Sequence, residues 1–460
     1  MKAMALLALA ILPSSLLTQD ITGAWNGVLE VQGTRLRLAF HIEQTDSGYV
    51  TTMDSPDQGA SGIPVAKTRF ADSALRLELP RISAVYEGTL AGDSIAGTWT
   101  QGLTTFPLNL SRNLAPADAR NRPQEPEPPY PYHEEEVVIH NEPHNVTLAG
   151  TLTLPRGTGP HPAVVLISGS GPQNRDEEVF GHKPFLVLAD HLTRRGIAVL
   201  RYDDRGIGKS TGSFSAATSR DFATDAASAV RYLASRSEID TDDIGLVGHS
   251  EGALIAPMVA TQTKDVAFIV LLAGIGVPGR EVSLMQSRTL RPFPVPDEAA
   301  YDRFTRRSIE IASSSADLSV KRAELTRHYE SIESVLESML PDGVEVDAFI
   351  AQQVTAMTRP WQQFFLAYDP ATDLEKVTVP VLSLNGSKDV QVPATVNQRG
   401  IRQALERAGN TRVVIKELPG LNHMFQESET GAMDEYPTIE QTFSPAALEE
   451  ITTWIRAQER

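Results

Sequence analysis

The chain contains no cysteine among its 460 residues. Disulfide bonds, thiolate nucleophiles, cysteine-ligated zinc and lipid attachment through an N-terminal cysteine are therefore excluded. Positive charge is also in short supply, because 41 lysine and arginine residues stand against 58 aspartate and glutamate residues, for a formal net charge of -17. Such a surface repels phosphate backbones, so nucleic acid is not an expected partner.

Long apolar runs are missing as well. The run at Ala3 to Leu12 is too short to span a bilayer. One lysine before it and a Pro-Ser-Ser break after it are typical of a secretory signal peptide. We therefore expect a signal peptide at residues 1–18 and a secreted or periplasmic protein, with an N-terminal helix packed on the protein body as the alternative. Since no later segment approaches transmembrane length, we expect no stable membrane insertion.

Residues 20–112 show a succession of short strands. Leu36, Leu38, Phe40 and Ile42 alternate with polar residues, as in a strand with one buried face. The sequence "AGDS" at 91–94 is typical of a hairpin turn. These signals predict an N-terminal antiparallel β domain, a small barrel or sandwich, without a cluster of candidate catalytic residues.

Prolines dominate the next segment and deny it strand or helix pairing, so we expect a linker at residues 113–132. The run "HEEE" at 133–136 is interpreted as solvated charge entering a strand rather than as a set of metal ligands.

The pattern changes again in residues 133–460, where apolar strands alternate with helices. Near-continuous apolar runs of this kind are typical of strands buried on both faces of a parallel sheet, which predicts an α/β fold with a mostly parallel sheet and helices on both faces. Ligands bind such sheets beyond the carboxyl ends of the strands. The expected strands are "AVVLIS" (163–168), "IAVLRYD" (197–203), "IGLVG" (244–248), "AFIVLLAG" (267–274), "PVLSLNG" (380–386) and "RVVIKEL" (412–418).

Residues from about 278 to 372 interrupt this alternation with helical patterns only. An insertion of that length between two strands predicts a helical cap over the strand ends. Its last part concentrates four aromatic residues, which we expect to pack in the cap rather than to contact substrate: Trp361, Phe364, Phe365 and Tyr368.

The pattern Gly-x-Ser-x-Gly, found in serine hydrolases, occurs twice. "GHSEG" at 248–252 follows a strand directly and opens an apolar helix, as a nucleophile elbow requires, so Ser250 is the predicted nucleophile. "GKSTG" at 208–212 is followed by a long loop, and we expect the next helix to start only near Asp221. A phosphate-binding loop ending at Ser210 would need glycine at position 203, where the chain has Asp203.

A serine nucleophile needs a base, and the base needs an acid, in the chain order Ser, acid, His for this kind of sheet. Two histidines follow Ser250. His328 lies on a charged helical stretch of the cap, whereas His423 lies in the loop after the last strand and is the predicted base. Asp389 follows the strand at 380–386 directly and is the predicted acid.

The oxyanion of an acyl transfer needs backbone N–H donors beside the nucleophile. One is expected at Glu251, the residue after Ser250. The second is expected from the glycine-rich loop "LISGSGPQNRD" at 166–176, at Ser170 or, failing that, Gly171.

With these motifs in place, residues from about 135 to the C-terminus resemble the α/β-hydrolase superfamily, and more narrowly the secreted bacterial esterases related to serine aminopeptidase-like hydrolases. The resemblance rests on "GSGPQNRD" (169–176), "RYDDRGIGKS" (201–210) and "GHSEG" (248–252). The chain departs from it at Ser168, where many relatives have histidine. The resemblance implies a carboxylesterase-like serine hydrolase that acts on a small-molecule ester through an acyl-serine intermediate.

Two other functions stay open from the sequence. The chain could be a serine peptidase that cleaves amides, or a non-catalytic binding protein built on the hydrolase fold. We expect no cofactor and no metal. The oligomeric state is open, with the N-terminal domain or the cap as the surface for a homo-oligomer.

Overall fold

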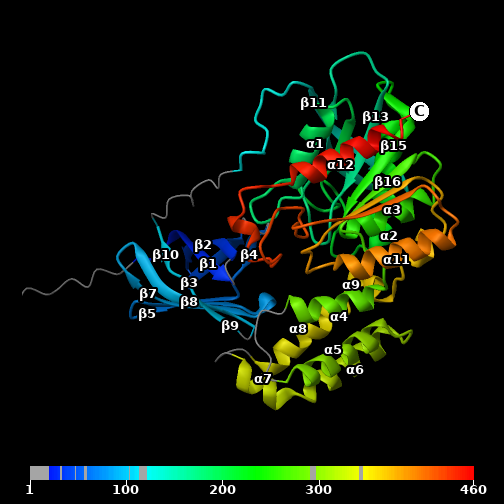
Figure 1. Ribbon diagram of the computed structural model, residues 1–460. Helices are drawn as coiled ribbons and strands as arrows, with labels where there is room; N and C mark the ends of the chain where they lie inside the picture. The colour runs from blue at the N-terminus through cyan, green and yellow to red at the C-terminus, as the bar shows by residue number, and fades with distance from the viewer. Residues whose placement is uncertain are drawn as a thin grey trace, which may run out of the picture.

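The computed structural model describes residues 20–31, 34–46, 48–55, 60–102, 104–112, 122–290, 297–340 and 345–459. The predicted signal peptide and the first part of the predicted linker, residues 113–121, lie outside the described residues. Two sheets organise the chain, one of ten strands in the N-terminal part and one of eight strands in the rest (Figure 1).

The N-terminal sheet is antiparallel throughout, with the strand order β4-β3-β2-β1-β10-β8-β7-β6-β5 and β9 paired to β8. The segment that carries β4 and β5 joins both ends of this sheet, because the N–H of Val65 bonds to Thr51 beside β4 and the N–H of Ala66 bonds to Glu78 of β6. Its strands are β1 (Gly23–Val31), β2 (Thr34–Thr45), β3 (Gly48–Ser55), β4 (Ala60–Pro64), β5 (Lys67–Ala71), β6 (Ala74–Leu79), β7 (Ala84–Ala91), β8 (Ser94–Gln101), β9 (Thr104–Pro107) and β10 (Leu110–Ser111).

The inside of this sheet is filled by side chains. Trp25, Phe40, Tyr86 and Trp99 are buried there, and Phe40 lies 5.8 Å from Tyr86 between ring centroids. The alternation at Leu38, Phe40 and Ile42 in the sequence corresponds to this buried face.

The second sheet has the order β11-β12-β14-β13-β15-β16-β17-β18. β14, β13, β15, β16, β17 and β18 pair in parallel, whereas β12 is antiparallel to both β11 and β14. The predicted fold class, an α/β sheet that is mostly parallel after an antiparallel β domain, is confirmed. The strands are β11 (His133–Asn141), β12 (Val146–Leu154), β13 (His161–Ile167), β14 (Ala198–Tyr202), β15 (Ile239–His249), β16 (Phe268–Leu272), β17 (Val381–Gly386) and β18 (Val413–Leu418).

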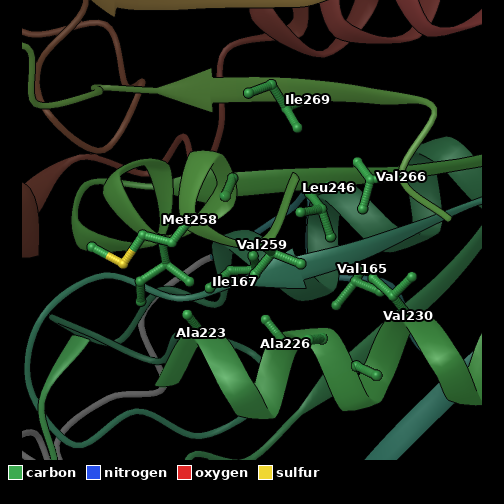
Figure 2. Close-up of a cluster of buried hydrophobic side chains, with 14 of the residues drawn as sticks. Val165, Ile167, Ala223, Ala226, Val230, Leu246, Met258, Val259, Val266 and Ile269 are labelled. Atoms are coloured by element: carbon green, nitrogen blue, oxygen red, sulfur yellow. The ribbon is translucent and has the colours of Figure 1, made fainter. Parts of the chain in front are cut away.

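Both faces of this sheet are covered, which explains the continuous apolar runs. Val165 and Ile167 of β13 face α2 and α3, together with Leu246 of β15 (Figure 2). Their neighbours Val164 and Leu166 point the other way, toward α1 and α12. The helices on the two faces are α1 (Pro184–Thr193), α2 (Ser219–Ala234), α3 (Glu251–Ala260), α11 (Ala394–Arg407) and α12 (Pro445–Arg456).

α2 begins earlier than the sequence suggested. Thr218 caps it, because the Thr218 hydroxyl and the Asp221 carboxylate form a capping box, and the helix starts at Ser219 rather than near Asp221.

The chain between β16 and β17 forms helices that carry a small core of their own, with Ile311, Leu325 and Ile350 among its buried residues. The helices of this segment are α4 (Gly279–Thr289), α5 (Glu298–Ser313), α6 (Leu318–Glu330), α7 (Glu333–Met339), α8 (Val346–Met357), α9 (Pro360–Ala367) and α10 (Ala371–Leu374). Of these, α5, α6, α7 and α8 lie as a separate group in Figure 1, whereas α10 contacts α3 and α11. We call all seven helices the cap.

Residues 122–132 form no strand or helix, but they are bound to the α/β part of the chain. Arg122 donates to the carbonyl oxygens of Gly181 and Pro437, each at 3.0 Å. The Gln124 side chain donates to the Phe443 carbonyl at 2.7 Å and accepts from the Thr442 N–H at 2.6 Å.

No helix within the described ranges is long and apolar enough to cross a membrane.

Candidate active site

Ser250 lies at a sharp turn between β15 and α3. Its backbone has φ 54° and ψ -111°, a left-handed conformation that a residue with a side chain seldom adopts. Strain of this kind is found at functional sites, where the surrounding structure holds it in place. The Ser250 N–H bonds to the Leu272 carbonyl at 2.8 Å, and its own carbonyl accepts from the N–H of Ala253 in the first turn of α3.

Both glycines of "GHSEG" are required by the closeness of the backbone around this turn. A Cβ on Gly248 would lie 2.1 Å from the Gly252 carbonyl oxygen, and a Cβ on Gly252 would lie 2.0 Å from the carbonyl oxygen of Ile167. Both distances are far inside van der Waals contact, so only glycine fits.

Asp389 and His423 come together although 34 residues separate them. The Nδ1 atom of His423 lies 2.8 Å from Oδ2 of Asp389, and both side chains are buried. The other oxygen of Asp389 accepts the N–H groups of Gln391 and Val392, at 2.9 and 2.8 Å, which fixes the carboxylate. A carboxylate accepts, so Nδ1 carries the proton and Nε2 is left with a free lone pair, as a general base requires.

The loop of His423 is fastened next to the nucleophile. Nε2 of His249, the residue before Ser250, lies 2.9 Å from the backbone oxygen of His423. The two imidazole rings lie 4.8 Å apart between centroids. The predicted base, in the loop after β18, and the predicted nucleophile, directly after β15, therefore lie at the same edge of the sheet, beyond the carboxyl ends of its parallel strands.

The glycine-rich loop after β13 lies against the nucleophile on another side. A Cβ placed on Gly169 would be 3.4 Å from Cβ of Ser250. The N–H of Gly169 is occupied, because it donates to Glu177 at 2.6 Å. Within the described residues, the N–H groups of Ser170 and Gly171 have no hydrogen-bond partner, which leaves them available to an oxyanion.

A second carboxylate, in the loop after β14, supports the same glycine-rich loop. Asp204 accepts from the Ser168 hydroxyl at 3.1 Å and from the Gln173 N–H at 2.9 Å. Burial raises the pKa of Asp204 well above its usual range, although both of these donors lower it. Ser168, where the sequence departs from many relatives, thus has a structural partner.

Ser210 of the second Gly-x-Ser-x-Gly pattern has a structural role. It is buried, its hydroxyl donates to the Asp203 carbonyl at 2.8 Å, and it accepts from the N–H of Ala149 at 2.9 Å. These bonds join two neighbouring segments beside β12 and β14. His328, the other histidine after Ser250, is half-buried in the cap, where its ring stacks on Phe304 at 4.1 Å.

The cap reaches the elbow through one hydrogen bond. Trp361 of α9 donates its indole N–H to Glu251 Oε1 at 2.6 Å, and the Ser219 hydroxyl donates to the same oxygen at 2.6 Å. Trp361 also stacks on Phe365 at 5.0 Å, so it combines cap packing with a contact to the residue after the nucleophile.

Sequence reasoning missed the supporting side chains Glu177 and His249. The signal for His249 was present, since a buried histidine beside a nucleophile needs partners for both ring nitrogens. Nothing in the sequence indicated that Glu177, 72 residues earlier, would be one of them.

A cavity of about 870 Å³ lies beneath residues 122–130 and does not include Ser250, Asp389 or His423. Charged side chains dominate its lining, among them Arg175 and Arg201, and these are paired with Asp203 and Asp176. An ester pocket would need more apolar surface than this lining offers.

An eight-stranded mixed sheet with helices on both faces and a strained serine between a strand and a helix defines an α/β-hydrolase. A family described as serine aminopeptidase, S33, matches residues 184–430, which is more than half of the chain. The chain therefore belongs to the serine aminopeptidase S33 family.

The esterase EstD of Thermotoga maritima is 26% identical to this chain over 303 residues, which are 65% of this chain and 62% of EstD. The chain thus spans less than two thirds of the length of that relative. Among solved structures, Est1E of Butyrivibrio proteoclasticus with ferulic acid has a TM-score of 0.41 at 18% identity, covering 70% of this chain and 98% of Est1E. The Pyrococcus furiosus esterase Pf2001 has a TM-score of 0.41 at 16% identity, covering 71% of this chain and 91% of its own. Structural likenesses this weak carry no information about substrate.

Proposed function

We propose that the protein is a serine carboxylesterase that cleaves small-molecule esters through an acyl-serine intermediate. In this proposal Ser250 attacks the ester carbonyl, and His423 takes the serine proton on Nε2 and returns it to the leaving alcohol. Asp389 holds the imidazole in the required tautomer. Water then attacks the acyl-serine with His423 again as base, which releases the acid and restores Ser250.

The pairing of Asp389 with His423 at 2.8 Å, next to a strained Ser250, carries this proposal. The N–H groups of Ser170 or Gly171 and of Glu251 would bind the oxyanion. The N–H of Glu251 lies in the first turn of α3, where backbone donors have no partner within the helix and the helix dipole favours negative charge. The similarity of this chain to the esterase EstD supports ester rather than amide substrates.

The test is the variant Ser250→Ala. We expect p-nitrophenyl butyrate hydrolysis to fall by about 10³- to 10⁶-fold, because the nucleophile is lost while binding groups remain. Circular dichroism and thermal unfolding should match the wild type. A Ser250→Ala variant that keeps full turnover would overturn the proposal.

Ser210→Ala is the matched control, since it alters the other Gly-x-Ser-x-Gly serine. It should still react with a fluorophosphonate probe at Ser250, although it should be less stable because the N–H of Ala149 loses its acceptor. If labelling is lost in Ser210→Ala, the nucleophile is Ser210 rather than Ser250.

The family description favours a second candidate, an aminopeptidase-like amide hydrolase. Aminoacyl p-nitroanilides compared with p-nitrophenyl esters at equal enzyme concentration distinguish the two. A higher kcat/KM for the anilides would make amide cleavage the main activity, and absence of any fluorophosphonate labelling would favour a non-catalytic binding protein.

We further propose that residues 1–18 direct secretion or export to the periplasm. The apolar run after Lys2 supports this. N-terminal sequencing of the protein from fractionated cells tests it, and a mature protein that still begins at Met1 would contradict it.

A further inference from the structure

His249 is buried beside the predicted base and directly precedes the predicted nucleophile in the chain, and both of its ring nitrogens face an oxygen acceptor. Nδ1 lies 2.9 Å from Oε1 of Glu177, and Nε2 lies 2.9 Å from the backbone oxygen of His423. A carbonyl oxygen only accepts, so Nε2 must carry a proton. An ionised Glu177 also only accepts, which places a second proton on Nδ1 and makes the ring an imidazolium.

The protein environment favours that charged form. Burial by itself would lower the pKa of His249, but the charge and hydrogen bond of Glu177, with the His423 carbonyl and the Asp389 carboxylate, raise the pKa above its ordinary value. His423 and Phe425 are the other rings packed against it. A buried ion pair with all its donors and acceptors matched can persist in a low-dielectric site.

Glu177 joins this pair to the glycine-rich loop. Its side chain is 4% exposed, and the same oxygen that faces His249 accepts the Gly169 N–H at 2.6 Å. The Glu177 backbone has φ 52°, a left-handed conformation, so the chain holds this carboxylate inward at a cost in backbone energy. Gly169 in turn lies against Ser250.

A continuous set of contacts therefore runs from Gly169, in the loop of Ser170 and Gly171, through Glu177 and His249, to the loop of His423. It joins the two segments whose relative position an acyl transfer depends on, the oxyanion donors and the base. None of its members needs to touch the substrate.

We propose that Glu177 and His249 are positioning residues, which fix the predicted oxyanion loop and the His423 loop relative to each other beside Ser250. The proposal rests on the proposed esterase function. It assigns to His249 the role of a two-sided donor and to Glu177 the role of a shared acceptor.

Four variants test it. Glu177→Ala removes the shared acceptor, and Glu177→Gln is the conservative variant. A glutamine oxygen in the place of Oε1 can accept from both the Gly169 N–H and the His249 Nδ1–H, so this variant should restore most of the activity. His249→Gln keeps a donor near the Nε2 position for the His423 carbonyl, and His249→Asn keeps one near the Nδ1 position for Glu177.

We expect kcat for p-nitrophenyl butyrate to fall by about 10- to 100-fold in Glu177→Ala and in both His249 variants, with KM little changed, because displaced oxyanion donors affect the transition state more than ground-state binding. The fluorophosphonate should still label Ser250 to completion, but more slowly. The double variant Glu177→Ala, His249→Gln should lose no more activity than Glu177→Ala alone, because both changes break the same contact.

Glu178→Gln and His140→Asn are matched controls. Glu178 is the exposed neighbour whose carboxylate accepts only from the Asn174 amide among the described residues, at 3.2 Å, and His140 is exposed on β11. Both controls should keep wild-type kcat.

Unchanged kcat in folded Glu177→Ala and His249→Gln, or losses that multiply in the double variant, would overturn the proposal. Should Glu177→Ala fail to fold, His249→Gln against Glu177→Gln decides, since the proposal requires the first to be slow and the second to be fast. If the wild-type protein shows neither ester turnover nor labelling of Ser250, the proposed function is refuted. If the wild type and all the variants are equally active, only the positioning role of Glu177 and His249 is refuted.

Discussion

Glu251 is a buried acid directly after the predicted nucleophile, and no ion pair joins it to a lysine, arginine or histidine of the part of the chain that the structure describes. Burial raises its pKa above the ordinary glutamate value of 4.5, although the hydrogen bonds from Ser219 and Trp361 lower it. A carboxyl with a raised pKa binds its proton more tightly in the folded state than in the unfolded one. The contribution of Glu251 to folding stability therefore falls as pH rises from 4.5 to the raised pKa, and stays low above it.

Glu251→Gln should remove this pH-dependent loss. The amide oxygen can still accept from both donors, and the backbone N–H predicted to bind the oxyanion is unchanged. We expect the free energy of unfolding of the variant to exceed that of the wild type at pH 8, and the difference to vanish near about pH 4, where both states of the wild type are protonated. Denaturant titrations at the two pH values measure it. An equal difference at both would mean that the carboxyl does not titrate as described.

At the level of elements, the cap, the elbow and α2 meet at Glu251 Oε1. Trp361 of α9 and Ser219 at the start of α2 both donate to it, and Glu251 itself begins α3. The sequence predicts that Trp361 packs in the cap, but its side chain packs against the core of the α/β sheet, where its ring stacks on Phe365 and its N–H reaches Glu251.

Trp361→Phe should therefore weaken the fastening of the cap while preserving most of its packing. Losing the donor to a buried carboxyl should cost about 1 to 3 kcal/mol in unfolding free energy. KM for p-nitrophenyl esters should rise more than kcat falls, since Trp361 contacts the residue after the proposed nucleophile and none of the proposed catalytic side chains is changed. Trp454→Phe makes the same change in α12, against Phe268 and away from the cap. It should lower stability without altering KM, and equal KM changes in both variants would contradict the role given to Trp361.

The sequence predicted those elements whose signals come from residues that are adjacent in the chain. The elbow at Ser250 and the apolar strands could be predicted, because a turn, its glycines and a run of β-branched residues are adjacent in the chain. β12 (Val146–Leu154) was not among the expected strands. Apart from Gly150, its valine and leucines alternate with threonine and alanine residues, and the strand pairs with β11 on one side and β14 on the other.

The Asp389 and His423 positions could be selected from the sequence because the fold dictates which loops follow which strand ends. Their pairing with each other needed no further information than that order. The contacts of Glu177 and Asp204 could not be predicted in this way. Each is one acidic residue among 58, and its partner is set by packing between distant loops.

For the molecule as a whole, the N-terminal sheet has a core that shares no residue with the cores of the α/β part. Its buried apolar residues all lie between Ile21 and Leu110. The contact from Ser83 to Gln352 of α8 links this sheet to the cap. By contrast Arg122 and Gln124 form hydrogen bonds to loops of the α/β part, so the predicted linker at 113–132 contains residues that are attached to that part.

A truncation that begins at Arg122 should therefore fold and keep its ester turnover. It removes the whole N-terminal sheet together with the core of that sheet and leaves the cores of the α/β part complete. A truncation that begins at Glu127 also removes Arg122 and Gln124, which fasten residues 180–181 and 437–443. We expect it to be less stable by about 1 to 3 kcal/mol for each side chain lost, since one is charged and the other binds three backbone groups.

The full chain with Arg122→Ala and Gln124→Ala is the matched control. It should reproduce the stability loss of the truncation that begins at Glu127 while retaining the N-terminal sheet. Thermal unfolding and p-nitrophenyl butyrate turnover measure both effects. If the truncation from Arg122 is insoluble while the double variant is stable, the N-terminal sheet is needed for the hydrolase to fold. Separate cores would then not mean that the α/β part folds independently of the N-terminal sheet. The same preparations, compared by analytical ultracentrifugation, show whether the N-terminal sheet or the cap carries any self-association.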